Sequence, residues 1–150
     1  VPQGIQFPYV GNGGEDGLTI TRRIVEQLGA LLAPTGKVQI IGTCLGNDKP
    51  FLDDLAETMS NSGLRALFIL PCRHDLKSVS NAPMLSSLVK TAVGSGHEEE
   101  DAVASYSDML TRLQATHLYS FYLIASPRAE GVPPVSYAPY YFRSADFWHI

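Results

Sequence analysis

The chain is poor in charge and in cysteine, and it has no long apolar run. Charged residues make up 17% of its 150 residues, and the net charge is −4. No basic cluster is longer than the pair Arg22-Arg23, so a broad basic surface for nucleic acid is lacking. Two cysteines, Cys44 and Cys72, do not make a disulfide framework and favour a reducing intracellular setting. No apolar run approaches the roughly eighteen residues of a membrane span, and no signal peptide is recognisable, which predicts a soluble cytoplasmic protein.

The residues that are present predict one compact domain of alternating helices and strands. Hydrophobic residues make up 45% of the chain, as is typical of a globular protein with a real core. Apolar residues at three-to-four spacing predict a helix that starts at Asp16, its cap, and stops at Pro34. The β-branched run 38–45 then predicts a strand that is covered on both faces. The chain begins with Val rather than Met, which indicates a processed chain or a fragment.

The same order repeats further along the chain. A second helix is expected with Asp48 as its cap and Gly63 just beyond its end. A second buried strand, 64–72, two more helices and a last strand, 118–125, complete an α/β pattern. From residue 126 the composition changes, because prolines recur and six aromatic residues follow from Tyr137 on. We therefore divide the chain into an α/β part, 1–125, and a Pro/aromatic-rich tail, 126–150.

The stretch "GNGGEDG" at residues 11–17 is glycine-rich but a poor phosphate loop. A dinucleotide-binding fingerprint needs a third glycine where Asp16 stands. A phosphate would also face the carboxylates of Glu15 and Asp16. The stretch is better interpreted as a flexible turn that leads into a capped helix.

Two other stretches carry side chains capable of chemistry. In "QFPY", Phe7 and Tyr9 flank a rigid proline and could sandwich a planar group, or they could simply pack against the sheet. In "CRHD", residues 72–75, a thiol, an imidazole and a carboxylate lie close in sequence. Adjacency in sequence rarely gives the spatial arrangement of a Cys/His nucleophile, so a loop with ordinary polar contacts is favoured. The cysteines and histidines lack zinc spacing, so we expect no metal site.

The run "FPYVGNGGEDGLTITRRIVEQLGALLAPTGKVQIIGTCLG" resembles the second half of class I S-adenosylmethionine-dependent methyltransferases. The most similar group carries an Asn-Pro-Pro-Tyr motif and includes the release-factor glutamine methyltransferases and the methyltransferase small domain enzymes. "QFPY" stands where that motif stands, "GGEDGL" and an amphipathic helix follow it, and "LLAPTGKVQIIG" is similar to the turn into the fifth strand. The resemblance covers residues 5–125 and is topological after residue 45.

This resemblance implies a fold and a set of site residues. The fold would be a partial Rossmann-like methyltransferase sheet with flanking helices, its final strand antiparallel between the two strands that precede it. Gln6, Pro8 and Tyr9 would be the catalytic positions that orient the methyl acceptor and pack on it, with Phe7 and Val10 as substrate-binding neighbours. Gln6 stands in place of the family's Asn and Phe7 in place of its first Pro, which changes the geometry offered to an amide or amine acceptor.

The resemblance also implies a cofactor and a partner. The cofactor of the parent protein would be S-adenosylmethionine, but the family's main binding motif, on its first three strands, does not occur in these residues. We therefore expect the chain to be inactive alone. We also expect it to self-associate, or to pair with another chain, through the exposed sheet edge "KVQIIGTCL". The alternative is a non-catalytic α/β interaction or oligomerisation module that uses the glycine stretch or the tail as its contact surface.

Overall fold

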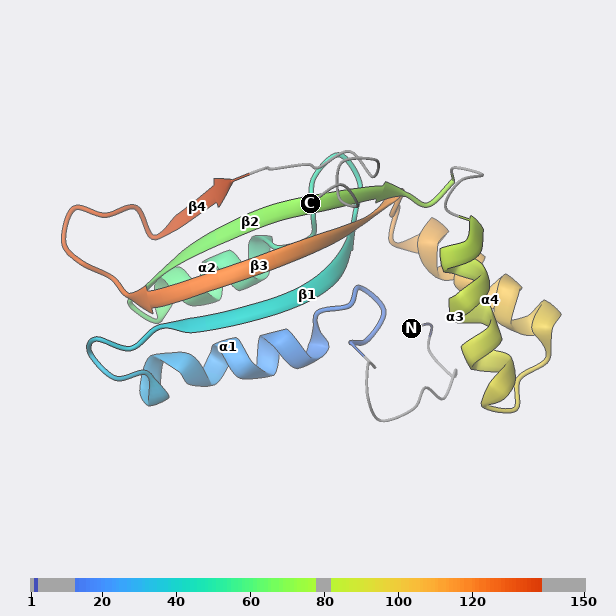
Figure 1. Cartoon of the computed structure of the whole chain (residues 1–150), viewed down its shortest axis with the longest axis horizontal. Helices are drawn as coiled ribbons and strands as arrows, with labels where there is room; N and C mark the ends of the chain where they lie inside the picture. Colours follow the sequence, from blue (N-terminus) through green and yellow to red (C-terminus); the bar gives the residue numbers. More distant parts are fainter. Residues whose placement is uncertain (1, 3–12, 78–81, 139–150) are drawn as a thin grey trace, which may run out of the picture.

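A computed structural model describes residue 2 and residues 13–77 and 82–138 of the chain. Within these ranges the protein is α/β, with a four-stranded mixed sheet flanked by four helices (Figure 1). The elements follow one another as α1 (Thr19–Leu31), β1 (Val38–Gly46), α2 (Asp53–Asn61), β2 (Leu64–Asp75), α3 (Ala82–Gly94), α4 (Glu99–Arg112), β3 (His117–Pro127) and β4 (Val135–Ala138).

The sheet has the strand order β1-β3-β2-β4. β3 pairs antiparallel with both β1 and β2, so these two strands run parallel to each other on either side of it. This confirms the expected antiparallel strand between two earlier ones, but that strand is not the last, because β4 follows it. β4 was not predicted: it lies in the Pro-rich tail and pairs parallel with Ala66–Ile69 of β2. Its four residues stand too close to prolines to show a strand pattern in sequence.

One face of the sheet holds the main core. Side chains of α1 and α2 pack there against alternate residues of β3, of which Tyr119, Phe121 and Leu123 are fully buried. None of the described helices packs on the opposite face, where Ile41 of β1 is 73% exposed. The expectation that β1 is covered on both faces is therefore wrong for the described residues. Its uncharged, β-branched sequence resembles a buried strand, but only alternate side chains meet the helices.

The helices α3 and α4 form a hairpin at one end of the sheet (Figure 1). They build a second apolar cluster with two residues from strand ends, Leu45 beside the end of β1 and Leu76 just after β2. Both residues lie at the carboxyl ends of the parallel strands. The hairpin thus lies beside the sheet edge at which ligands bind in open α/β folds.

The helix ends test the capping expectations. α1 begins at Thr19 and α2 at Asp53, so neither Asp16 nor Asp48 caps its helix. Aspartate side chains also bind nearby backbone in turns, and Asp16 does so by accepting the N–H of Leu18 at 3.0 Å. The expectation for Gly63 is confirmed, because it follows the last residues of α2 with a left-handed φ of 69°.

Candidate functional site

The candidate site is the sheet edge formed by the carboxyl ends of β1 and β2. Both strands end opposite the first residue of β3, since Gly46 and Asp75 each pair with His117. The residues Gly13–Gly17, called here the glycine segment, border this edge on one side and the α3–α4 hairpin borders it on the other. The predicted site residues lie outside the described part of the chain: Gln6, Phe7, Pro8, Tyr9 and Val10.

The glycine segment is packed tightly against the rest of the chain. A Cβ at Gly17, whose φ is 90°, would lie 2.6 Å from the backbone oxygen of Thr43. A Cβ at Gly14, whose φ is 76°, would lie 2.1 Å from Oγ1 of Thr19. The oxygen of Gly13 accepts the N–H of Thr19 at 2.7 Å. The space that side chains would fill is thus already occupied by protein atoms, which supports a turn and does not fit a cradle for phosphate or for a nucleotide-like cofactor.

Asp16 anchors the glycine segment to β1 and α1. Its backbone oxygen accepts the N–H of Leu45 at 2.9 Å. Its carboxylate accepts hydrogen bonds from both terminal nitrogens of Arg22, whose Nε in turn binds Asp54. Burial alone would raise the pKa of Asp16, but the hydrogen bonds from Arg22 and Leu18 outweigh it and hold the pKa below its ordinary value of 3.8. The Asp16 hydrogen bonds raise the pKa of Arg22, which therefore stays charged.

Replacing Asp16 by asparagine tests this anchor. Asparagine keeps the oxygen that accepts the Leu18 N–H but loses the ion pair, so we expect the free energy of unfolding to fall by about 1 kcal/mol at neutral pH. A carboxyl whose pKa is depressed in the folded state stabilises it above its ordinary pKa. The difference between wild type and D16N should therefore shrink as pH falls from 3.8 through the lower folded pKa.

Urea unfolding at several pH values measures this difference. Asp108→Asn is the matched control, since Asp108 is exposed on α4, and its effect should be small at every pH. A D16N effect that stays constant down to the most acidic pH would contradict the role assigned to the Asp16 charge.

A second ion pair ties the glycine segment to the helical hairpin. Both terminal nitrogens of Arg112, the last residue of α4, bind the carboxylate of Glu15, with Nη1 3.0 Å from Oε2. Ninety-seven positions separate the two residues in sequence. The glycine segment and the end of α4 are thereby held at the same edge of the sheet.

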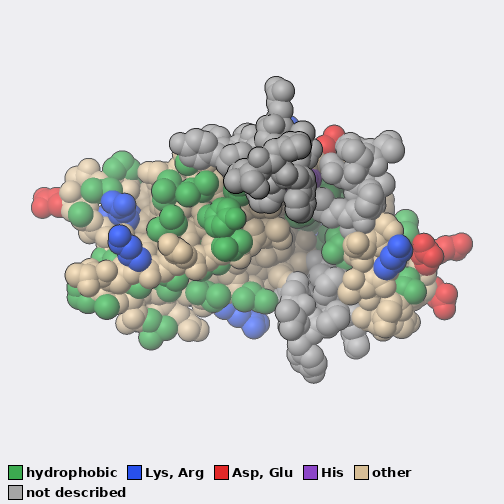
Figure 2. Space-filling view, in the orientation of Figure 1, with side chains coloured by type: hydrophobic (Ala, Val, Ile, Leu, Met, Phe, Trp, Pro, Cys, Tyr) green, Lys and Arg blue, Asp and Glu red, His purple; other side chains and the backbone are tan. Residues whose placement is uncertain are grey.

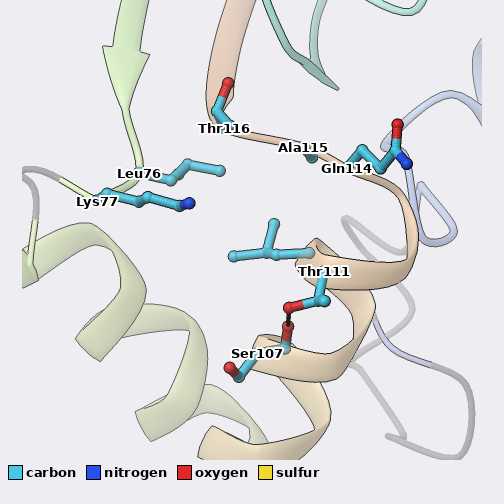
Figure 3. Close-up of a pocket in the computed structure, with 8 residues that line it drawn as sticks. Leu76, Lys77, Ser107, Thr111, Gln114, Ala115 and Thr116 are labelled. Carbon is cyan, nitrogen blue, oxygen red and sulfur yellow. Dashed lines mark hydrogen bonds between the residues drawn. The ribbon is translucent and has the colours of Figure 1, made fainter.

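A cavity of about 420 Å³ opens between the end of β2 and the end of α4 (Figure 3). Gln114, one of the lining residues, has a left-handed φ of 52° because it follows the C-terminus of α4, where glycine is more usual. The N–H of the next residue, Ala115, satisfies the oxygen of Leu110 at 2.9 Å. The cavity is lined by Leu76, Lys77, Ser107, Leu110, Thr111, Gln114, Ala115 and Thr116.

The "CRHD" stretch does not assemble a catalytic group among the described residues. The register of β2 shifts between Ile69 and Cys72, after which Cys72 and His74 share one face of the sheet and Asp75 lies on the other. The second cysteine, Cys44, is fully buried, and burial raises the pKa of its thiol to about 12. Within the described ranges no three His, Cys, Asp or Glu side chains are grouped to hold a metal ion.

Comparison with known proteins leaves the site to be interpreted from its geometry. No family model matches the chain, and no curated protein matches it. None of the helices in the described ranges is both long and apolar enough to cross a membrane.

The cavity could not be predicted from the sequence, because its lining comes from two short, motif-free stretches that only the hairpin brings together.

Proposed function

We propose that the chain forms the acceptor-binding part of a class I S-adenosylmethionine-dependent methyltransferase. The observation that carries the proposal is the strand order, in which β3 lies antiparallel between the parallel strands β1 and β2. The resemblance to the family implies this order. The sequence features that carry the resemblance precede these strands in the order that it implies. They are "QFPY", the glycine segment, an amphipathic helix and the "LLAPTGK" turn.

The anchoring of the glycine segment supports a site at this edge. Asp16 is bound to Leu45 near the end of β1, and "QFPY" ends at Tyr9, four residues before Gly13. Four residues of extended chain span at most about 14 Å. Chain connectivity thus limits the distance between Tyr9 and Gly13, which supports an acceptor site near the carboxyl ends of the strands, where α/β proteins bind their ligands.

The proposed chemistry is methyl transfer by direct displacement, which depends mainly on aligning the acceptor with the methyl group. The amide of Gln6 and the backbone near Pro8 would orient the acceptor, and Tyr9 would pack on it. S-adenosylmethionine would supply the methyl group. Gly13, Gly14 and Gly17 of the glycine segment close against protein atoms, so the proposal assigns the binding of that cofactor to sequence other than these 150 residues.

Calorimetry with S-adenosylmethionine tests this assignment. The chain of 150 residues should show no tight binding, whereas the protein that includes the preceding coding sequence should bind the cofactor. If that longer protein fails to bind it, the proposal is wrong.

The second candidate function is an interaction or oligomerisation module, which the edge strand β1 favours. Its nine residues include no charge and no proline, and its register with β3 is unbroken. The open face next to it (Figure 2) is uncharged over three rows of paired residues. Natural edge strands usually carry charges, prolines or bulges that prevent pairing with another chain. The open face consists of Gln39, Ile41, Thr43, Leu67, Ile69, Cys72, Ser120, Tyr122 and Ile124.

A further inference from the structure

The cavity beside α4 combines an apolar floor with a polar rim. Leu76 and Ala115 are buried at its base, and Leu110 is half-buried. Hydroxyl groups of Ser107 and Thr111 lie along the rim. Its volume of about 420 Å³ falls in the usual range for pockets that hold a small molecule.

The charge that lines the cavity is positive. Lys77 is the one charged residue among its lining residues, and Figure 3 shows its side chain extending from the end of β2 across the cavity. In the described part of the chain no carboxylate pairs with its Nζ. The neighbouring Asp75 binds the backbone N–H of Lys77 at 2.8 Å rather than its ammonium group, and Glu15 binds Arg112.

The hydrogen bonds of the α4 end also favour an anion over a cation. Free carbonyls at a helix C-terminus would attract a positive group. Here the oxygens of Leu110 and Thr111 already accept the N–H groups of Ala115 and Gln114, at 2.9 and 3.1 Å. With these two carbonyls occupied, the ammonium group of Lys77 is the one charged group among the described residues that line the cavity.

We propose that this cavity binds a small organic anion, with its carboxylate or phosphate group at Lys77 and its apolar part on Leu76, Leu110 and Ala115. As a statement about the methyl acceptor, this inference rests on the proposed function. As a statement about binding, it does not, because it can be measured on the chain of 150 residues without any methyl donor.

The test is an NMR titration of the isotope-labelled chain with hexanoate, its neutral amide hexanamide, hexylammonium and acetate. Hexanoate should shift the amide signals of Leu76, Lys77, Ala115 and Thr116. Hexanamide should bind about two- to fivefold more weakly, since an exposed ion pair stabilises only modestly. Acetate should also bind more weakly than hexanoate, because it cannot cover the apolar floor. Hexylammonium should bind most weakly of the four.

Two lysine variants separate charge recognition from non-specific binding. K77Q should abolish the preference for hexanoate over hexanamide, and K90Q, on the exposed surface of α3, should retain it. The inference is overturned if hexanoate and hexanamide bind equally to the wild type, if K77Q keeps the preference, or if the shifts map away from the cavity. None of these outcomes depends on whether the longer protein binds S-adenosylmethionine.

Discussion

Replacing Gly17 by alanine is expected to lower the free energy of unfolding by about 3 kcal/mol. Two costs add at this position. Its φ of 90° is unfavourable for any residue with a Cβ, and that Cβ would lie 2.6 Å from the backbone oxygen of Thr43. Thr43 belongs to β1, which is held by its pairing with β3. The backbone of Thr43 therefore cannot move away from the new Cβ without a loss of stability. The turn that positions the glycine segment at the sheet edge would be displaced.

Gly131→Ala is the matched control for this change. Gly131 also has a left-handed φ, 76°, but no atom lies within 4 Å of the Cβ that alanine would add. It should therefore cost only about 1 kcal/mol, from the backbone conformation alone. Urea unfolding followed by circular dichroism measures both variants. Equal losses for the two would contradict the close packing of Gly17 on β1.

Replacing Ile41 by lysine is expected to weaken the proposed self-association of the chain about a hundredfold. Ile41 is 73% exposed in the middle of β1, and it lies in one row with Tyr122 and Ile69 on the open face. In a pair of β1 strands from two copies, the introduced ammonium groups would repel each other and interrupt an uncharged surface. Sedimentation equilibrium at micromolar concentrations should show an associated wild type and a monomeric variant.

A lysine placed elsewhere controls for the added charge. Ala104→Lys adds the same group to an exposed position of α4 and should leave association unchanged. A monomeric wild-type chain would count against pairing through β1. The protein that includes the preceding sequence then separates the two functions, since a methyltransferase sheet would cover this edge internally, whereas an interaction module would still associate through it.

The order of helices and strands could be predicted from sequence because apolar periodicity and glycine and proline positions are local signals. Gly63 shows this well, since a helix end followed by a left-handed residue is a short-range feature. Helix starts were less predictable. Asp16 and Asp48 have the composition of caps, but the backbone around them forms turns, and Asp16 instead binds Leu18 and Arg22.

The open face and the cavity could not be predicted for a different reason. A strand with one exposed face usually alternates polar and apolar residues, but β1 carries no charge and two adjacent isoleucines, so its sequence does not show this alternation. The cavity depends on how the α3–α4 hairpin sits at the end of β2, and Lys77 becomes a candidate ligand only because Leu110 and Thr111 are brought opposite it. Such contacts are set by tertiary packing and leave no periodic trace along the chain.

The most direct test of the central claim is methyl transfer by the protein that includes the preceding coding sequence. Labelled S-adenosylmethionine would be incubated with that protein and with cell extract from a strain that lacks it. We expect an acceptor to become labelled, and we expect Q6A and Y9A to lose most of the transfer while retaining cofactor affinity, because these residues would contact the acceptor. Transfer that is unaffected by both substitutions, or a protein that neither binds S-adenosylmethionine nor labels any acceptor, would contradict the account.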